Sequence, residues 1–292
     1  MKKMCFSLVD VFSGVRYSGN PLAVFVDLGD LDPAQMQAIA REINFSETTF
    51  VRSLQPKPHE GYDVRIFSPT EELPFAGHPT LGTAFVIREQ LRSERQEPIS
   101  TLVLNLAVGP IPVEISSGDV FWMKQNEATI GPVLDNAMEV AAALGLDLSD
   151  LHETWPIREV STGLPFLMVP LRGLGALGQS RVVSDRFSAL MAQTTAKGVF
   201  LFCEETRDEA HQFAARMFAP GLGIMEDPAT GSANGCFAGY WGALGREVDA
   251  IVEQGYEMGR PSQVRIRGQF KDGRLQVSVG GEVVAIAQGL WG

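Results

Sequence analysis

The sequence predicts an α/β protein made of two similar lobes, and two observations support this fold class. Short apolar runs with strand character alternate with longer helix-like segments along the 292 residues. In addition, the segment RIFSPTEELPFAGHPTLG that begins at Arg65 recurs from Arg216 as RMFAPGLGIMEDPATGSANG, with a loop three residues longer. Because the repeat lies near the middle of each half, it indicates two lobes of one design that face a common site.

The first lobe is expected to comprise residues 1–117. Its first helix begins at Asp32-Pro33, an N-cap followed by proline at the first helical position, and is expected to end near Ile43. A second helix, residues 79–91, follows the first copy of the repeat. Strand patterns are found at residues 5–12, 22–26, 48–52, 62–67, 102–106 and 112–115.

The second lobe is expected to comprise residues 118–280, after a change of composition at Ser116-Ser117-Gly118-Asp119. Helices are expected at residues 136–144, 184–196, with Ser184 as a cap, and 236–244 despite its glycines. Strand patterns are found at residues 120–124, 157–161, 166–171, 199–203, 212–218, 264–267 and 275–279. One more strand, 283–287, lies in the segment 281–292, and periodicity leaves open whether this segment returns to the first lobe.

Charge and composition restrict the partners. The chain has 24 Lys and Arg against 35 Asp and Glu, a net charge of -11, and no basic run. This balance argues against nucleic acid or an anionic membrane as a partner. A small anionic substrate remains possible, because a glycine-rich backbone nest binds anions without net positive charge. The lack of a signal peptide pattern and three widely spaced cysteines, expected to be reduced core residues, indicate a cytoplasmic protein.

Both copies of the repeat place a glycine-rich loop before a helix. The first backbone N–H groups of a helix have no internal partner and lie at its positive end, so such a loop suits a carboxylate. Gly231 and Ser232 open the second of these helices, and Gly77 and His78 open the first. Ser232 has an alternative interpretation as an ordinary N-cap, and His78 as a capping or packing residue. A helix N-terminus disfavours the imidazolium, so His78 is expected to be neutral.

Two acids are candidates for proton transfer. Glu47, in NFSETTF, lies where the first helix gives way to a strand, and an apolar cleft there would raise the pKa of its carboxyl. Asp227 directly precedes the PATG turn and is placed to hold a polar group of a ligand or to relay a proton. For Glu47 the alternative is a solvated loop residue, and for Asp227 and its neighbour Glu226 it is solvation or a favourable contact with the helix dipole.

Several other site types do not fit. The loop 221–235 lacks the Gly-Lys-Ser/Thr ending of a phosphate-binding loop, and the chain has no G-x-G-x-x-G after a first strand and no G-x-S-x-G. The four histidines show no metal-ligand spacing, so no metal site is predicted.

Five segments together resemble the phenazine-biosynthesis PhzF family. They are DVFSGVRYSGNPLAVF, NFSETTF, RIFSPTEELPFAGHPTLG, EDPATGSANG and QGYEMGRPS. The resemblance implies a diaminopimelate epimerase-like fold, with two pseudo-symmetric lobes, each a curved mixed sheet around a central helix, and the site between them. It also implies a homodimer and general acid–base catalysis without a cofactor.

By motif, the resemblance makes Glu47 the proton shuttle, surrounded by His78, Asp227 and Ser232. We further expect Ser46, Gly77 and Gly231 to bind the substrate. The characterised activity of the family is isomerisation of trans-2,3-dihydro-3-hydroxyanthranilate, so the sequence predicts an isomerase that moves a proton within a small carboxylate-bearing, cyclic amino-acid-like molecule.

One departure from the wider fold family narrows the chemistry. Related amino-acid epimerases carry a cysteine beside each glycine-rich loop, whereas this chain has Phe75-Ala76 and Pro228-Ala229 there. Thiol-based racemisation is therefore not expected. Two alternatives to the isomerase stay open at this point, a catalytically silent binding or interaction protein and an epimerase with bases other than thiols.

Overall fold

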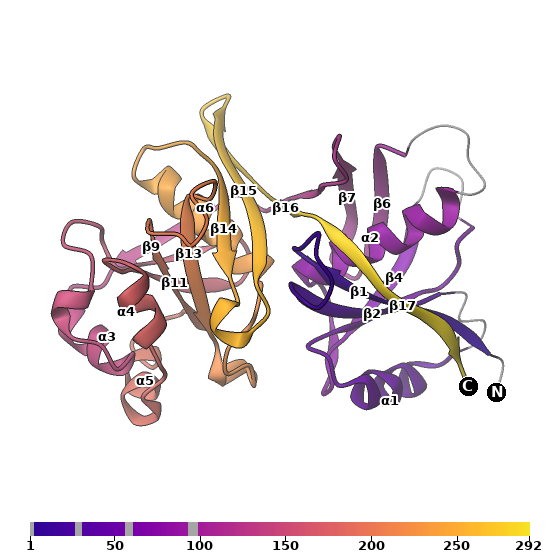
Figure 1. Ribbon diagram of the computed structural model, residues 1–292, viewed down its shortest axis with the longest axis horizontal. Helices are drawn as coiled ribbons and strands as arrows, with labels where there is room; N and C mark the ends of the chain where they lie inside the picture. Colours follow the sequence, from indigo (N-terminus) through magenta and orange to yellow (C-terminus); the bar gives the residue numbers. More distant parts are fainter. Residues whose placement is uncertain (1–2, 27–30, 56–60, 93–98) are drawn as a thin grey trace. The chain divides into compact units, whose positions relative to one another are not determined.

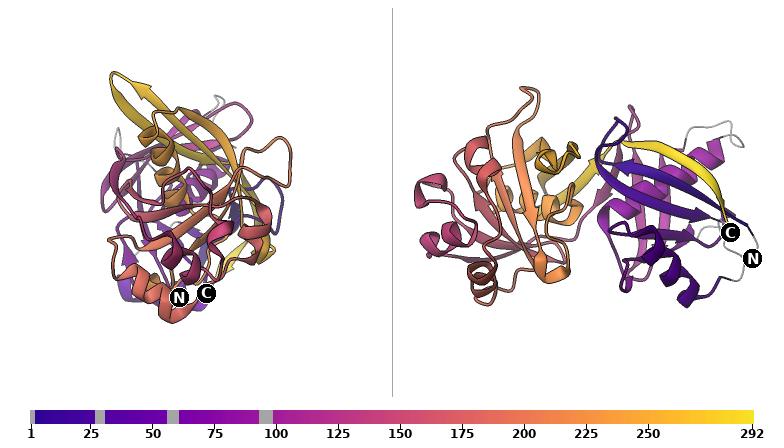
Figure 2. Two further views of the ribbon diagram at one scale, coloured as in Figure 1. Left: turned by 90° about the vertical axis from the view of Figure 1, so that its left-hand side faces the viewer. Right: turned by 60° about the horizontal axis from the view of Figure 1, so that its bottom comes forward.

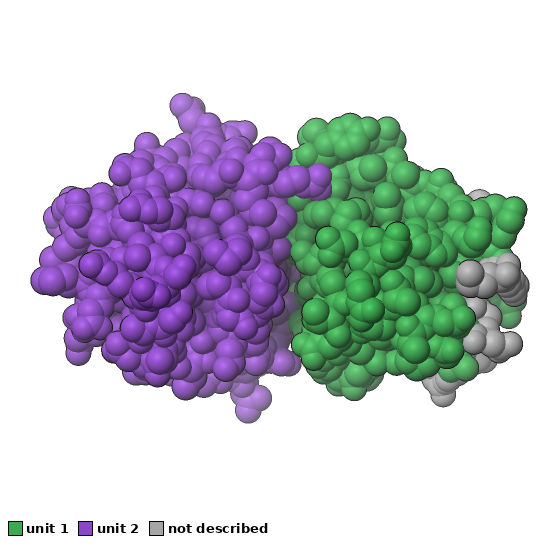
Figure 3. Space-filling model, turned by 90° about the horizontal axis from the view of Figure 1, so that it is seen from below, with its two compact units in different colours: residues 1–124, 280–292 green, residues 125–279 purple. Residues whose placement is uncertain are grey.

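The computed structural model describes residues 3–26, 31–55, 61–92 and 99–292, and the chain divides into two compact units (Figure 3). Unit 1 comprises residues 1–124 and 280–292, and unit 2 comprises residues 125–279. The boundary predicted from the sequence was 117/118. The boundary between the compact units lies later because strand β8 (Phe121–Lys124) pairs antiparallel with β7 (Gly109–Ile115), so the stretch 116–119 is the turn of a hairpin within unit 1.

Unit 1 contains one mixed sheet. Its strands pair in the order β17, β1, β2, β3, β4, β6, β7, β8, and the β2–β3 and β4–β6 pairs are parallel. The remaining strands are β1 (Met4–Val11), β2 (Asn20–Val26), β3 (Thr48–Val51), β4 (Tyr62–Phe67), β5 (Glu72–Leu73), β6 (Thr101–Leu106) and β17 (Val283–Trp291). In the described part of unit 1, two helices accompany the sheet, α1 (Pro33–Ile43) and α2 (Gly77–Arg92).

The C-terminal strand completes this sheet. β17 pairs antiparallel with the whole of β1, from Met4 opposite Trp291 to Val11 opposite Val283. The first and last strands of the chain therefore lie side by side (Figures 1 and 2). Periodicity alone left this return open, because the partner strand is at the other end of the sequence.

The two helices of unit 1 cover different faces of its sheet. Helix α2 packs against most of the strands and is buried on nearly every side. It lies so close that a Cβ on Gly82 would come within 2.6 Å of Leu22. Helix α1 packs on the other face, where Met36 joins a core with Phe25 and Phe50. Its start has the expected cap, since Asp32 accepts from the backbone N–H of the third helical residue.

Unit 2 contains a second mixed sheet. Its strands pair in the order β9, β10, β11, β12, β13, β14, β15, and the β11–β12 and β13–β14 pairs are parallel. The strands are β9 (Thr129–Val133), β10 (Arg158–Ser161), β11 (Pro165–Pro170), β12 (Gly198–Cys203), β13 (Phe213–Phe218), β14 (Val248–Gln254) and β15 (Ser262–Lys271), followed by β16 (Arg274–Gly281), which leads back to unit 1.

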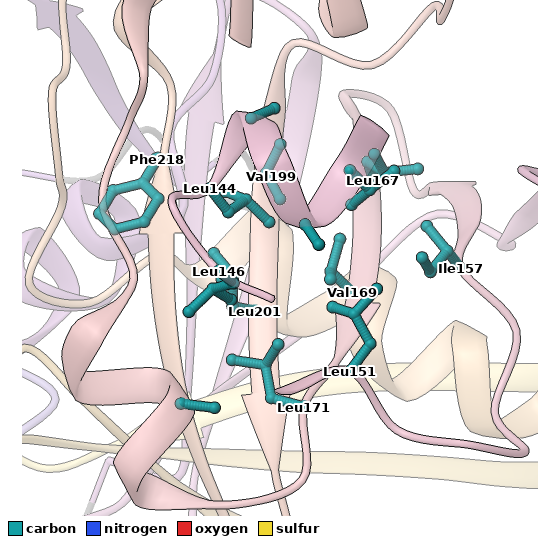
Figure 4. Close-up of a cluster of buried hydrophobic side chains, with 14 of the residues drawn as sticks. Leu144, Leu146, Leu151, Ile157, Leu167, Val169, Leu171, Val199, Leu201 and Phe218 are labelled. Atoms are coloured by element: carbon teal, nitrogen blue, oxygen red, sulfur yellow. The ribbon is translucent and has the colours of Figure 1, made fainter. Parts of the chain in front are cut away.

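Four helices cover the sheet of unit 2. They are α3 (Ala137–Ala143), α4 (Leu174–Gln179), α5 (Ser184–Met191) and α6 (Gly231–Ala243). Helix α6 is buried from Ala233 to Trp241, as expected for a helix that is apolar all round. The helices α3, α4 and α5 pack on the strands through a second core that includes Leu144, Leu167 and Leu201 (Figure 4).

The two sheets repeat one plan. From β1 to β7 the pairings run antiparallel, parallel, antiparallel, parallel, antiparallel, and the series from β10 to β15 is the same. The registers match as well, since Phe50 lies opposite Arg65 and Leu201 lies opposite Arg216. Helices α2 and α6 fill corresponding positions. The two pseudo-symmetric lobes predicted from the internal repeat are therefore confirmed.

Some local predictions were wrong. The helix expected at 184–196 ends at Met191, and its N-cap is Val183 without a side-chain cap. Three elements were not predicted, namely β9, α4 and β14. β9 was missed because TIGPV combines Gly and Pro, and β14 was missed because it ends in the buried polar residues Glu253 and Gln254. Cys5 is exposed and not in the core.

Within the part of the chain that the structure describes, no helix has both the length and the apolar character needed to cross a membrane.

Candidate active site

The residues singled out in the sequence form two groups, one in each unit. The N-terminal half-site consists of Ser46, Glu47, Gly77 and His78 in unit 1, and the C-terminal half-site consists of Asp227, Gly231 and Ser232 in unit 2.

In the N-terminal half-site, a carboxylate faces an imidazole. Oε2 of Glu47 lies 3.4 Å from Nε2 of His78, and the two side chains are 13% and 7% exposed. Glu47 directly precedes β3, and His78 is the second residue of α2. A hydrogen bond of 2.8 Å between the hydroxyls of Thr49 and Thr83 joins the same strand to the same helix. The start of β3 is therefore tied to the N-terminal half of α2, which helps to keep the pair together.

Burial keeps His78 neutral. It lowers the pKa of the imidazole from 6.5 to about 3, and a hydrogen bond to the backbone of Pro21 opposes this shift only in part. A neutral His78 was predicted from the sequence because of the helix dipole, whereas desolvation is the largest cause of its lowered pKa. Because proline has no N–H, its carbonyl oxygen must accept this bond from the ring.

The bond to Pro21 also determines the tautomer of His78. Nε2, the nitrogen that faces Glu47, makes no hydrogen bond, so Nδ1 donates to the carbonyl oxygen of Pro21. In a neutral ring with its proton on Nδ1, Nε2 carries a lone pair. His78 therefore presents an acceptor to Glu47.

The other two members of this half-site are less enclosed. Gly77 is the first residue of α2, so its N–H belongs to the group that finds no partner within the helix. Ser46 is partly buried beside Glu47, in the short connection between α1 and β3. That connection begins at Asn44, whose left-handed backbone (φ 57°) ends α1.

In the C-terminal half-site, Asp227 is held by a neighbouring threonine. The carboxylate is buried, and its Oδ2 accepts a hydrogen bond from Oγ1 of Thr230. Thr230 is the N-cap residue of α6, but its side chain makes no cap hydrogen bond to the helix. The first N–H groups of α6 are thus not satisfied by this hydroxyl, as an anion-binding helix start requires.

Gly231 and Ser232 are the first two residues of α6. Gly231 is buried and Ser232 is partly buried. Ser232 is not the N-cap, because Thr230 has that position. The alternative interpretation of Ser232 as an ordinary capping residue is therefore wrong.

Glu226 has a structural role that repeats between the units. Its two carboxylate oxygens accept from Nε and a terminal nitrogen of Arg216 at 2.9 and 2.8 Å. In unit 1, Glu72 accepts in the same way from Arg65, at 2.7 and 2.6 Å. Each arginine also lies over the ring of a phenylalanine two residues later in its strand. Glu226 is thus the partner of a strand arginine and not a solvated loop acid.

Sequence reasoning missed the polar side chains beneath Asp227. Gln254, at the end of β14, hydrogen-bonds to Thr230 and to the carbonyl oxygen of Asp227, and it contacts Asn234 of α6. The signal was present, because Gln254 opens the segment QGYEMGRPS, one of the five that carried the resemblance.

Other features of the molecule lie apart from these residues. A cavity of about 670 Å³ in unit 1 is lined by 14 residues, among them Phe50, Arg52 and Leu106, but by none of the N-terminal half-site. Burial raises the pKa of the thiols of Cys203 and Cys236 to about 12 and about 11. Within the described ranges, no three His, Cys, Asp or Glu side chains gather closely enough to hold a metal ion.

Comparison with known proteins identifies the family. Residues 9–289 match the PhzC-PhzF family model, described as phenazine biosynthesis-like protein. The chain belongs to this family. It is 36% identical to an uncharacterised isomerase of Mesorhizobium japonicum, covering 99% of both chains, and 36% identical to trans-2,3-dihydro-3-hydroxyanthranilate isomerase of Pseudomonas fluorescens, covering 97% of this chain and 98% of the relative.

Solved structures agree with this assignment. A PhzF-family phenazine biosynthesis protein of Bacillus anthracis superposes with a TM-score of 0.89 at 26% identity, covering 100% of this chain and 99% of the other. A hydroxyproline epimerase of Agrobacterium vitis, at 11% identity and a TM-score of 0.61, shares the fold and covers 99% of this chain and 92% of its own. The diaminopimelate epimerase-like fold is therefore confirmed, and this PhzF-family protein is an isomerase.

Proposed function

We propose that this PhzF-family protein moves a proton within a small, carboxylate-bearing, cyclic amino-acid-like substrate, with Glu47 as the acid and base and without a cofactor. The observation that carries the proposal is the pair of Glu47 and His78, 3.4 Å apart and almost buried, at the start of α2. A carboxylate and an imidazole held in this way are suited to general acid–base catalysis. The 36% identity to trans-2,3-dihydro-3-hydroxyanthranilate isomerase supports a substrate of this class.

The proton transfer proceeds in two steps. In the first, the carboxylate of Glu47 takes a proton from an acidic carbon of the substrate, and the electron pair of the broken C–H bond stays on the substrate. In the second, the carboxyl returns the proton to another atom on the same face. Between these steps Glu47 is protonated, and the lone pair on Nε2 of His78 accepts a hydrogen bond from a protonated Oε2. His78 thus stabilises the intermediate state of Glu47.

The glycine-rich helix starts bind the rest of the substrate. The backbone N–H groups of Gly77 and Gly231 and the hydroxyl of Ser232 hold the carboxylate, because these donors lie at the positive ends of two helices. Asp227 orients a polar group such as an amine, and Ser46 contacts the substrate beside Glu47.

An NMR assay in D₂O tests the proposal. Wild type, Glu47→Gln and Glu42→Gln are incubated with trans-2,3-dihydro-3-hydroxyanthranilate and related cyclic amino acids. Glu42 is the matched control, since it is an exposed glutamate of α1 in the same segment. Rearrangement or deuterium uptake by wild type and Glu42→Gln is expected, with a loss of about 10²–10⁴-fold in Glu47→Gln.

Two outcomes would contradict the proposal. Unchanged turnover in Glu47→Gln would remove Glu47 from the chemistry. Saturable binding of these compounds to wild type without any exchange would instead indicate a binding protein on the same fold.

The homodimer expected from the resemblance is a separate proposal, and sedimentation equilibrium of the wild type tests it.

A further inference from the structure

We propose that Thr230 and Gln254 are positioning residues that fix the carboxylate of Asp227 for the reaction. This inference rests on the proposed function, because it assigns the two residues to an acid whose role is itself proposed.

The hydroxyl of Thr230 connects the other two residues in a defined direction. Nε2 of Gln254 lies 3.1 Å from Oγ1 of Thr230, and an amide nitrogen can only donate. The threonine oxygen therefore accepts from Gln254, and its single hydrogen is left for Oδ2 of Asp227. A hydrogen bond from a hydroxyl to a carboxylate is charge-assisted, so it holds the acid more strongly than a neutral pair would.

The amide of Gln254 is itself fixed on both sides. Its Oε1 accepts from the backbone N–H of Thr230 at 3.2 Å and from Nδ2 of Asn234 at 2.9 Å. Its Nε2 also donates to the carbonyl oxygen of Asp227 at 2.8 Å. If the side-chain amide of Gln254 were rotated by half a turn, its nitrogen would face the N–H donors of Thr230 and Asn234, and its oxygen would face the carbonyl oxygen of Asp227. Gln254 and Asn234 are fully buried, so a broken contact there is costly.

The backbone after Gln254 packs directly on the loop that carries Asp227. Gly255 has a left-handed conformation, with φ 78°. A Cβ at this position would lie 2.5 Å from the carbonyl oxygen of Pro228, which is much closer than van der Waals contact and therefore a clash. Glycine is required here so that the turn can approach the loop, and this close approach brings Gln254 to Asp227 and Thr230.

The internal repeat shows that the fold does not need these polar groups. Aligning Gly77 with Gly231 pairs Ala76 with Thr230 and Leu73 with Asp227. Unit 1 therefore has the apolar Leu73 in place of the acid, and it has Ala76 in place of the threonine whose hydroxyl binds that acid.

The strand registers identify the unit 1 counterpart of Gln254. β4 and β6 pair with Asp63 opposite Asn105, while β13 and β14 pair with Ala214 opposite Glu253. Since Arg65 and Arg216 are equivalent, Asn105 corresponds to Glu253, and the next residue, Leu106, corresponds to Gln254. All three polar side chains of unit 2 are thus apolar in unit 1, as expected if Thr230 and Gln254 serve the acid and not the fold.

The test compares single and double variants in the D₂O assay. Thr230→Val keeps the shape of the side chain but removes the donor, Thr230→Ser keeps the donor, and Gln254→Leu copies the residue of unit 1. Thr230→Val and Gln254→Leu are expected to lower kcat/KM about 10- to 100-fold, the range for a hydrogen bond to a charged group, while Thr230→Ser stays near wild type. In an Asp227→Asn background, Thr230→Val is expected to cause no further loss.

A crystal structure of Thr230→Val gives a second readout that does not depend on turnover. The carboxylate of Asp227 is expected to leave its wild-type position. An unmoved carboxylate, full activity of Thr230→Val, or an equal loss in both backgrounds would overturn the positioning role. If Asp227→Asn alone kept wild-type activity, the role of Asp227 in the proposed function would fail, and the crystal structure would still decide whether Thr230 positions it.

Discussion

Glu47 and Gly198 occupy equivalent positions in the two halves of the molecule. Glu47 directly precedes Thr48, which pairs with Phe67 at the end of β4. Gly198 directly precedes Val199, which pairs with Phe218 at the end of β13. These two strands carry the equivalent arginines of the repeat. A side chain at Gly198 is blocked, because a Cβ there would lie 2.8 Å from the carbonyl oxygen of Phe218. The fold thus carries an acid at this position in unit 1 and has no room for one in unit 2.

This asymmetry predicts chemistry with one base. An epimerase that inverts a carbon needs a base and an acid on opposite faces, and the position related to Glu47 by the repeat cannot supply the second group. We therefore expect no inversion of trans-4-hydroxy-L-proline, the compound bound by the structurally similar hydroxyproline epimerase. Chiral chromatography after incubation in D₂O measures this. Inversion accompanied by deuterium uptake, and lost in Glu47→Gln, would contradict it.

The buried His78 predicts a dependence of stability on pH. Its pKa is about 3 in the folded chain and 6.5 as the ordinary value, so between these values the unfolded chain binds a proton that the folded chain does not. Stability is therefore lost as pH falls from 6.5 towards 3, by up to about 1.4 kcal/mol per pH unit, and above 6.5 it is retained in full and no longer depends on the protonation of His78.

A variant isolates this contribution. His78→Asn keeps an N–H that can donate to Pro21 but does not ionise. Between pH 7 and pH 4.5, urea unfolding should show wild type losing about 2–3 kcal/mol more than His78→Asn. His152→Asn, at a partly exposed histidine stacked on Trp155, is the control and should follow wild type. Parallel curves for wild type and His78→Asn would mean that the imidazole is protonated equally in both states.

Much of the fold was predictable because its signals are local. The cap at Asp32, the alternation of apolar residues in the strands and the two copies of the repeat each lie within one short segment. The pairing of β17 with β1 joins opposite ends of the chain, so no window of sequence contains it. β14 was missed because its end is buried but polar, and the reason for Glu253 and Gln254 lies in partners far away in sequence.

In the candidate site, too, local features were predictable from the sequence and contacts between distant segments were not. Motifs placed Glu47, His78, Asp227 and Ser232 on their elements, but the contact between Glu47 and His78 depends on how β3 packs against α2. The tautomer of His78 depends on Pro21, a residue of a third segment. Such relationships are set by tertiary packing and cannot be obtained from spacing within a motif.

The cysteines predict a single accessible thiol. Cys5 is exposed on β1, whereas Cys203 and Cys236 are buried, and burial raises the pKa of their thiols to about 12 and about 11. Since the thiolate is the reactive form, native protein at pH 8 should react with one equivalent of a thiol reagent, and denatured protein with three. Mass spectrometry should place the native label on Cys5. Rapid native labelling of a Cys5→Ser variant would contradict the assignment.

The two arginine–glutamate pairs predict unequal costs for the same substitution. Glu226 and Arg216 are 17% and 10% exposed, and another nitrogen of Arg216 donates to the carbonyl oxygens of Leu177 and Ser180 at the end of α4. Glu72 and Arg65 are 39% and 37% exposed. Removing one partner of a buried pair leaves a charge without compensation, which costs about 3–5 kcal/mol, whereas an exposed pair contributes about 0–1 kcal/mol.

Glu226→Gln and Glu72→Gln therefore form a matched comparison. A chain of two compact units need not unfold in one step, so each unit needs its own probe, and the chain provides Trp155 and Trp241 in unit 2 and Trp122 and Trp291 in unit 1. Urea unfolding followed by these tryptophans should show a large loss in unit 2 for Glu226→Gln and a small one in unit 1 for Glu72→Gln. Added salt should reduce only the latter, since it screens exposed charges. Equal losses of unfolding free energy in the two variants would mean that burial of Arg216 at the end of α4 does not strengthen its ion pair with Glu226.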